Sequence, residues 1–538
     1  MLNKILKVAI SVPLSHAFDY LPPGGGPAAA PGSRVLVPFG RKQQVGLVLD
    51  LAEGTHLPAD KIRRCSRTLD DQPLLSADDL WLIRFTSDYY HHPIGEVVAS
   101  ALPALLRQGK ALNPVLHFVA ITDGGASADI ETLAKRAPRQ AELLELLLDA
   151  GGNGVDEDAL TDQLPTWRRA AKGLFEKGYA QRFDAVAETP DPAPVEAGEP
   201  GPELNPSQQD ALERIRSDSG FGVYLLDGVT GSGKTEVYLS LIRDVLDSGR
   251  QVLILVPEIG LTPQLVSRLT RRLGIAPAVM HSGLTDTARL AAWRSARSGA
   301  ARLVVGTRSA VFTPLPDLGL IVIDEEHDHS FKQQEGLRYS ARDLAIARGK
   351  QRDIPVVLGS ATPTLEVLQH CRSGNFTRLE LPERAGGAKP PRLRLIDLSR
   401  APASDGLSEP LLRAIGAHLD DGGQALIFLN RRGFAPTLIC STCGHVAECA
   451  RCDSRMTVHA RARALRCHHC GAERPLDTQC TECGAEVRPL GEGTERLEDA
   501  LRGHFPDRNI QRIDFDSICV PTRMSARRCC RRATIFRS

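Results

Sequence analysis

Residues 228–235 read GVTGSGKT, the spacing G-x-x-x-x-G-K-[ST] that is typical of a phosphate-binding loop. An apolar run, VYLLD, precedes the loop and a helix-forming run, EVYLSLIRDVL, follows it. The glycines let backbone N–H groups close around phosphates, the lysine can reach the β- and γ-phosphates, and the threonine hydroxyl can bind Mg²⁺. A chance glycine turn is the alternative, and the flanking strand and helix argue against it. We therefore expect a nucleoside triphosphate to contact Gly228, Val229, Thr230, Gly231, Ser232, Gly233, Lys234 and Thr235.

Acidic side chains end a second apolar run, in LIVIDEEH. Two adjacent carboxylates at a strand tip suit hydrolysis of a nucleoside triphosphate. Asp324 would hold Mg²⁺, and Glu325 would orient and deprotonate the attacking water. A solvated acidic turn is the alternative. The wholly apolar strand before the acids, together with the phosphate loop upstream, favours the catalytic interpretation.

The elements that must hold these residues follow a β–α–β pattern from Leu204 onward. Short buried strands alternating with helical stretches predict a parallel sheet in a doubly wound α/β domain, and a similar unit starts at residues 424–430. Ligands bind such sheets at the carboxyl ends of the strands. Small, polar segments stand at those ends in the order VPEIGLTPQ (256–264), HSGL (281–284), VGTRSA (305–310), GSATP (359–363) and LNRRGF (429–434).

The order GVTGSGKT, VPEIGLTPQ, DEEH, GSATP and LNRRGF resembles that of superfamily 2 helicases, and in wording it is closest to the replication-restart helicases of the primosome. The resemblance covers residues 1 to about 516. It implies an α/β multidomain fold with RecA-like P-loop parallel-sheet helicase lobes, an N-terminal β domain, a winged-helix-like domain and a two-zinc cysteine insert. It also implies ATP-driven, 3′-to-5′ unwinding of DNA at stalled forks, with ATP and Mg²⁺ as cofactors.

The resemblance assigns roles to further residues. Gln208, in LNPSQQDAL, would read adenine, and Arg308, Ser360 and Thr362 would couple hydrolysis to DNA. The segment 327–343 resembles the aromatic-rich loop of the family. Its Phe331 and Tyr339 would sense single-stranded DNA by stacking on bases, with ordinary core packing as the alternative.

The chain divides into segments by composition. The expected boundaries are a 3′-end DNA-binding β domain at 1–105, a winged-helix-like domain at 106–183, a Pro- and acid-rich linker at 184–203, helicase lobe 1 at 204–400, a partial helicase lobe 2 at 401–516 and a basic tail at 517–538. Residues 78–107 and 138–183 carry helical patterns. The adjacent histidines in YYHHP (89–93) do not face one another on a helix, which favours a packed helix end over a metal site.

The N-terminal module of the resembled family captures the 3′ end of a nascent strand. Phe18, Asp19, Tyr20, Gly40 and Lys61 match its pocket residues. An aromatic ring could stack on a base, a carboxylate could accept a hydrogen bond from a 3′-hydroxyl, and a lysine could bind phosphate. An aromatic residue at a strand end is the alternative on residue type alone.

Eight cysteines form four C-x-x-C pairs within residues 440–483, separated by gaps of 5, 14 and 9 residues. Each pair is a zinc knuckle, so the set predicts two Cys₄ sites for two Zn²⁺, with a structural role because four thiolates leave no open position. Which pairs share an ion is less clear. The 14-residue gap suits a ribbon joining the second and third knuckles, and the resemblance implies the same nesting. The ligands are Cys440, Cys443, Cys449, Cys452, Cys467, Cys470, Cys480 and Cys483.

Composition bounds the class of protein. Charged residues make up 24% and hydrophobic residues 42% of the chain, which indicates a soluble globular protein. No run of 18 apolar residues is present, and the N-terminus reads as a strand rather than a signal peptide, so we expect a cytoplasmic location and no membrane partner. The expected partners are forked and single-stranded DNA, other primosome proteins and single-stranded-DNA-binding protein. Net charge is +1, so a DNA site must be a local patch.

The tail at 517–538 has six arginines and three cysteines in 22 residues and no acid. The Q-x-x-G-R-A-G-R motif of the family, whose arginine stabilises charge on the transferring phosphate, is found nowhere in the chain. We expect the tail to be out-of-frame translation, with an evolved DNA-binding arm as the alternative. We expect this chain to bind nucleotide and forked DNA but to unwind poorly. A non-catalytic DNA-binding fragment and a P-loop NTPase not acting on DNA are the competing functions.

Overall fold

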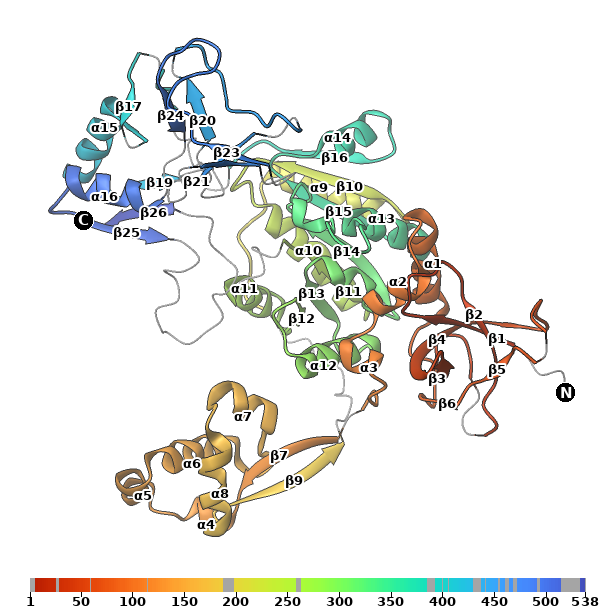
Figure 1. The fold of residues 1–538 in the computed structure, drawn as a ribbon. Helices are drawn as coiled ribbons and strands as arrows, with labels where there is room; N and C mark the ends of the chain where they lie inside the picture. Colours follow the sequence, from red (N-terminus) through yellow and green to blue (C-terminus); the bar gives the residue numbers. More distant parts are fainter. Residues whose placement is uncertain are drawn as a thin grey trace. The chain divides into compact units, whose positions relative to one another are not determined.

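A computed structural model describes most of the chain (Figure 1). The described residues are 5–513 and 533–537, apart from gaps at 26–28, 59, 114, 187–197, 258–262, 385–391, 399, 405, 429–436, 441, 453–454, 460–463, 468–471 and 491–493. They form two compact units, residues 1–389 and 390–538. The second unit therefore begins before residue 401, the boundary expected from the sequence. The segments LNRRGF and most of VPEIGLTPQ lie outside the described residues.

The first unit begins with a six-stranded sheet in the order β5-β2-β1-β4-β3-β6. Its strands are β1 (Ile5–Ile10), β2 (Phe18–Leu21), β3 (Arg34–Phe39), β4 (Lys42–Ala52), β5 (Arg63–Arg64) and β6 (Arg67–Thr68). Alternate side chains of β1 enter different cores, with Val8 in one and Ala9 in the other. Helices α1 (Ala77–Tyr89), α2 (Ile94–Ala101) and α3 (Ala104–Arg107) follow, as the helical pattern at 78–107 predicted.

A small domain combines helices with the three-stranded sheet β8-β7-β9. Its elements are β7 (Val115–Ile121), α4 (Asp123–Ala126), α5 (Ile130–Arg136), α6 (Pro138–Ala150), β8 (Val155–Asp156), α7 (Glu157–Gln163), α8 (Trp167–Glu176) and β9 (Ala180–Val186). The helical pattern expected up to residue 183 is wrong over its last residues. Gly178, with a φ of 68°, lies in the turn after α8 and leads into β9, which pairs with the whole of β7.

The largest sheet has seven parallel strands in the order β12-β13-β11-β14-β15-β10-β16. Its strands are β10 (Val223–Gly228), β11 (Gln251–Leu255), β12 (Ala278–Met280), β13 (Leu303–Gly306), β14 (Leu318–Asp324), β15 (Val356–Ser360) and β16 (Thr377–Leu381). The helices are α9 (Pro206–Ser217), α10 (Lys234–Asp247), α11 (Pro263–Leu273), α12 (Asp286–Arg297), α13 (Ala341–Arg352) and α14 (Leu365–Arg372). This is the parallel sheet of a doubly wound α/β domain that the β–α–β pattern predicted.

Helices cover both faces of this sheet (Figure 1). On β10, Leu225 enters the core shared with α12 and α13, whereas Leu226 enters the core shared with α9, α10 and α11. The first of these cores also contains side chains of α1 and α2, including Ile83 and Val97. The N-terminal domain and the lobe therefore share one continuous hydrophobic core.

In the second unit, one helix precedes a cysteine-rich insert and one helix follows it. Two small sheets also lie outside the insert. Outside the insert are β17 (Ala403–Ser404), β18 (Leu407–Ser408), α15 (Glu409–Asp420), β19 (Leu426–Phe428), α16 (Thr494–His504), β25 (Asn509–Ile513) and β26 (Ala533–Arg537). The insert contains β20 (Thr437–Cys440), β21 (Thr457–His459), β22 (Ala464–Arg466), β23 (Glu473–Pro475) and β24 (Val487–Leu490). Strand β26, from the basic tail, pairs antiparallel with both β19 and β25.

Within the described part of the chain, no helix has the length and apolar character needed to cross a membrane.

Candidate nucleotide, DNA and zinc sites

The phosphate loop joins the end of β10 to the start of α10, as the motif requires. Gly231 and Gly233 have φ values of 82° and 79°, a left-handed conformation that side chains disfavour. The Lys234 ammonium donates a hydrogen bond to the carbonyl oxygen of Gly228 at 2.8 Å, so its charge is folded over the loop. The Ser232 hydroxyl is buried and has no hydrogen-bond partner among the described residues. An unsatisfied buried donor in a glycine cradle at a helix N-terminus fits a phosphate ligand.

Gln208 is buried, and both atoms of its amide are engaged. Its Oε1 accepts a hydrogen bond from the Asn205 N–H at 2.9 Å, which forms a capping box at the start of α9. Its Nε2 donates to the carbonyl oxygen of Ser232 at 2.8 Å. In this structure Gln208 therefore braces the phosphate loop. Reading adenine, the role expected from the sequence, would require it to exchange one of these partners for the base.

Asp324 ends β14 and Glu325 follows it, and only β15 separates β14 from β10, the strand that leads into the phosphate loop. Burial and the neighbouring Glu325 carboxylate raise the pKa of Asp324, while Tyr238 and Lys234 act to lower it. The Tyr238 hydroxyl on α10 donates to Asp324 Oδ1 at 3.2 Å. Glu325 has a φ of 53°, a strained conformation of the kind that concentrates at functional sites. The two carboxylates are thus held at the strand tip where a metal and a water could bind.

Glu326 joins three segments that lie apart in the sequence. Its side chain is fully buried and lies 3.0 Å from Arg342 Nη1 on α13. Its Oε1 accepts a hydrogen bond at 2.8 Å from the N–H of Thr364, the residue that caps α14 after the GSATP segment. Arg342 also donates to the Thr364 hydroxyl at 2.9 Å. The third acid of DEEH thereby ties the end of β14 to the starts of α13 and α14.

The predicted coupling residues contact the same region. The Ser360 hydroxyl lies 2.7 Å from His327 Nδ1 and accepts a hydrogen bond from the Thr362 N–H at 3.0 Å. Arg308 donates to the carbonyl oxygen of Ser330 at 2.9 Å, so the VGTRSA segment supports the loop that follows DEEH. These contacts join Ser360 to His327 and to Thr362, and they join Arg308 to the segment that begins at His327.

Removal of the Glu326 carboxylate should destabilise the lobe. Glu326→Ala leaves the Arg342 guanidinium and the Thr364 N–H without their buried acceptor, and breaking such a pair costs about 3–5 kcal/mol. Urea unfolding followed by circular dichroism measures the change. Glu366→Ala, which removes an exposed acid from the first turn of α14, is the matched control and should stay within about 0.5 kcal/mol of the parent. A similar free energy of unfolding for both variants would contradict the proposed junction.

The aromatic residues of the 327–343 segment are packed rather than exposed. Phe331 and Tyr339 have exposed fractions of 3% and 4%. The Tyr339 ring meets Phe312 edge to face at a centroid distance of 5.2 Å. The structure therefore shows the core-packing alternative, and neither ring can stack on a base unless the loop rearranges.

The residues predicted for the 3′-end pocket gather around β2. Phe18 packs edge to face on Phe39, whose ring centroid is 5.2 Å away, and Gly40 follows Phe39 in the turn to β4. The Asp19 carboxylate pairs with Lys7 at 2.7 Å. Tyr20 is buried, and its hydroxyl donates to the carbonyl oxygen of Pro38 at 3.0 Å. The exposed Lys61 precedes β5, which pairs with β2.

The first and fourth cysteine knuckles come together. Cys440 and Cys483 have their sulfurs 3.5 Å apart, and those of Cys443 and Cys480 are 3.6 Å apart. All four ligand atoms lie within 4.8 Å of one another. Tetrahedral Zn–S bonds of about 2.3 Å place sulfurs about 3.8 Å apart, so the set fits Zn²⁺. The N–H groups of Cys443 and Thr442 lower the pKa of the Cys440 thiol to about 6, whereas contacts with neighbouring thiols raise the pKa values of Cys443 and Cys483. Zinc binds the deprotonated form of each.

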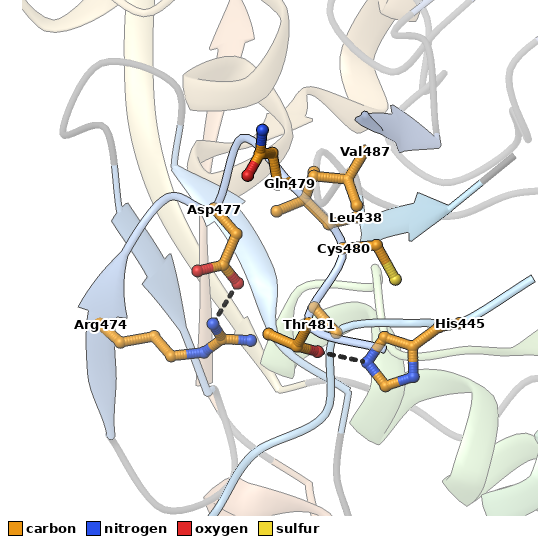
Figure 2. Close-up of a pocket in the computed structure, with 9 residues that line it drawn as sticks. Leu438, His445, Arg474, Asp477, Gln479, Cys480, Thr481 and Val487 are labelled. Atoms are coloured by element: carbon orange, nitrogen blue, oxygen red, sulfur yellow. Dashed lines mark hydrogen bonds and ion pairs between the residues drawn. The ribbon is translucent and has the colours of Figure 1, made fainter. Parts of the chain in front are cut away.

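The second and third knuckles form the other site. Cys449, Cys452 and Cys467 group together, with the Cys452 and Cys467 sulfurs 3.5 Å apart, and the fourth expected ligand, Cys470, lies outside the described residues. The structure thus shows the nested arrangement. Figure 2 shows the surroundings of Cys480, where the hydroxyl of Thr481 lies 3.4 Å from His445 Nε2 and Arg474 pairs with Asp477.

Comparison with known proteins matches these parts one by one. Residues 7–103 match the PriA 3′DNA-binding domain, residues 205–370 the DEAD/DEAH box helicase domain, and residues 449–475 the Cys-rich region of PriA DNA helicase. Replication restart protein PriA of Haemophilus influenzae is 43% identical over 527 residues, which are 96% of this chain and 70% of that protein. The chain belongs to the PriA family of replication restart proteins. The expected helicase class, its link to replication restart and the zinc-binding cysteine insert are thereby confirmed.

Other members of the PriA family are similar over comparable lengths. The Bacillus subtilis protein is 34% identical over 558 residues, covering 90% of this chain and 69% of its own length. Among solved structures, RecG bound to a three-way DNA junction shares 21% identity over 41% of this chain and 29% of its own, with a TM-score of 0.30. A likeness at that level supports no inference.

Proposed function

We propose that the chain encodes an ATP-dependent DNA helicase that moves 3′-to-5′, recognises stalled replication forks and initiates their restart. The observation that supports this most is the junction at Glu326. It joins the catalytic strand tip to the two segments, GSATP and 327–343, that the family uses to respond to DNA. Hydrogen bonds between the nucleotide site and these segments favour an enzyme that acts on a nucleic-acid strand over one that only hydrolyses nucleotide.

Each residue at the nucleotide site has a distinct part. Lys234 and the loop N–H groups would bind the phosphates, and Thr235 and Asp324 would hold a Mg²⁺ ion, which would neutralise the phosphate charge. Glu325 orients the attacking water and accepts its proton. Tyr238 fixes the rotamer of Asp324, because it donates to one carboxylate oxygen and leaves the other for the metal. Gln208 holds the phosphate loop through its hydrogen bond to Ser232. It would contact the adenine after releasing either Ser232 or Asn205.

The N-terminal residues would receive the 3′ end of a nascent strand. Phe18 offers a ring to the last base, Asp19 a carboxylate to the 3′-hydroxyl, and Lys61 a charge to phosphate. Gly40 allows the chain to turn beside that ring, at a φ of 59°. Tyr20 supports the site by joining two strands, since its hydroxyl donates a hydrogen bond from β2 to the carbonyl oxygen of Pro38 on β3.

Further parts of the proposal concern the cell. We place the protein in the cytoplasm and expect forked DNA, other primosome proteins and single-stranded-DNA-binding protein as partners. The two zinc sites hold the insert together and present its surface to DNA or to these proteins. We also propose that this chain binds nucleotide and forked DNA.

ATP hydrolysis by the 538-residue protein, measured with and without forked DNA and beside a Lys234→Ala variant, tests the proposal. We expect DNA binding that weakens as salt rises and nucleotide binding that needs Lys234. A DNA-stimulated rate that requires Lys234 would support the helicase. DNA binding without nucleotide binding would favour a non-catalytic fragment. Turnover unaffected by single-stranded DNA would favour an NTPase that does not act on DNA.

A further inference from the structure

Tyr90 is the C-cap residue of α1, and its side chain contacts a loop of the helicase lobe at two points. Its hydroxyl accepts a hydrogen bond from the N–H of Ser340 at 3.1 Å. The ammonium of Lys332 lies 5.1 Å from the centroid of its ring, within the range of a cation–π contact. Lys332 and Ser340 form an isolated antiparallel bridge, so they are the two stems of the loop between them. One side chain of the N-terminal domain therefore holds both stems of this loop.

The helix that carries Tyr90 is fixed along the lobe. At the other end of α1, Asp78 accepts a hydrogen bond from Gln351 at 2.7 Å and pairs with Arg352 at 3.0 Å. Gln351 and Arg352 end α13, whereas Ser340 caps its start. The two helices thus run antiparallel with a polar contact at each end. A shift of α1 along its axis would move the stems held by Tyr90.

The stems lead to the catalytic acids by short steps. The Ser340 hydroxyl accepts a hydrogen bond from the Asp343 N–H at 3.2 Å and so begins α13. Arg342, in that first turn, lies 3.0 Å from the buried Glu326. Arg308 donates to the carbonyl oxygen of Lys332 at 3.3 Å on the other stem. Glu326 directly follows the two acids assigned to metal and water.

We propose that Tyr90 is a positioning residue that couples DNA bound by the N-terminal domain to the nucleotide site, by holding the stems of the Lys332–Ser340 loop. The coupling rests on the proposed function, whereas the positioning of the loop does not. Contiguous contacts permit a coupling but do not measure it, so the test must compare affinities. Because coupling of binding is reciprocal, DNA and nucleotide should change one another's affinity by the same factor.

Hydrogen exchange of the full chain without ligands tests the positioning. Tyr90→Phe keeps the ring over Lys332 and removes the acceptor of the Ser340 N–H. We expect amides of residues 332–343 to exchange about fivefold faster, in line with the loss of one hydrogen bond. Peptides from the middle of α13 should be unchanged. Tyr89→Phe is the matched control, because Tyr89 is an exposed neighbour on the same helix. Equal exchange in Tyr90→Phe and the parent would overturn the proposal.

Nucleotide affinity tests the coupling. The Kd of a fluorescent ATP analogue with Mg²⁺ is measured alone and with a saturating duplex that has a recessed 3′ end. We expect DNA to change this Kd at least about fivefold in the parent and in Tyr89→Phe, which keeps the ring that packs on Tyr90. In Tyr90→Leu the change should disappear, while the Kd of each ligand alone stays within about twofold of the parent. Lys332→Met, which removes the cation above the ring, should lose part of the effect.

The outcomes separate the two proposals. If Tyr90→Leu keeps the full change, Tyr90 does not couple the domains. If the parent binds both ligands without any change in Kd, the coupling is refuted while the proposed function stands. If the parent binds neither ligand, the proposed function and the coupling fail together, and the exchange data still decide whether Tyr90 positions the loop.

Discussion

Lys234→Ala should weaken Mg²⁺–ATP binding about 30- to 1,000-fold. The ammonium is the only cationic side chain in the GVTGSGKT loop, and its present partner is the neutral carbonyl oxygen of Gly228. When phosphates occupy the loop, the charge can turn to them. Truncating one partner of a close, desolvated charge pair costs about 2–4 kcal/mol, which corresponds to that range of affinities.

Titration with a fluorescent ATP analogue measures this effect and does not depend on turnover. Lys350→Ala removes an exposed lysine near the end of α13 in the same lobe and should leave the Kd within about twofold. Both variants should unfold at the parent's temperature, since the hydrogen bond that Lys234 donates is to its own loop. An affinity for Lys234→Ala close to that of the control would place the nucleotide elsewhere.

Features written in consecutive residues could be predicted from the sequence. GVTGSGKT specifies its own loop, because its glycines permit the left-handed turns at Gly231 and Gly233. The alternation of apolar strands and helices predicted the parallel sheet that places Asp324 near the loop. The four C-x-x-C knuckles predicted two zinc sites, because each pair already brings two thiolates together.

Features that depend on contacts between residues far apart in the sequence could not be predicted. The sequence assigned roles to Asp324 and Glu325, but the partners of Glu326 lie 16 and 38 residues further along the chain. Tyr238 lies in the helix-forming run EVYLSLIRDVL, and nothing in that run indicates its hydrogen bond to Asp324. Its approach to β15 explains Gly359, where an added Cβ would stand 1.4 Å from the Tyr238 hydroxyl. A glycine within an apolar strand was the one signal that pointed to such a close approach.

Residue type alone did not predict which aromatic side chains are buried. Phe331 and Tyr339 suit base stacking by type, yet both are packed in the core shared by the lobe and α1. Tyr90 was interpreted only as part of a packed helix end. Its contacts with Lys332 and Ser340 arise because α1 and α13 are antiparallel, an arrangement that no local pattern encodes.

The zinc pairing gives the second large effect. Cys480→Ser should reduce the zinc content from two ions per chain to one, since its sulfur is one of four ligands in the first site. A structural zinc site contributes on the order of 10 kcal/mol to the folding of a small domain. We therefore expect protease cleavage within residues 437–490 to become much faster. Cys371→Ser, outside the knuckles on α14, should keep both ions and the parent's resistance.

Paired substitutions distinguish the nested arrangement from one in which neighbouring knuckles share an ion. Cys443→Ser with Cys480→Ser removes two ligands of the same site if the sites are nested, so one zinc should remain. Cys443→Ser with Cys452→Ser damages both nested sites, so no zinc should remain, whereas one zinc would remain if the first and second knuckles shared an ion. If the first and second knuckles shared one ion, the pair Cys443→Ser and Cys480→Ser would instead lose both. Zinc quantified by mass spectrometry on the purified, dialysed chains decides between the two arrangements. The grouping of the first knuckle with the fourth in the structure predicts the nested result for both pairs of substitutions.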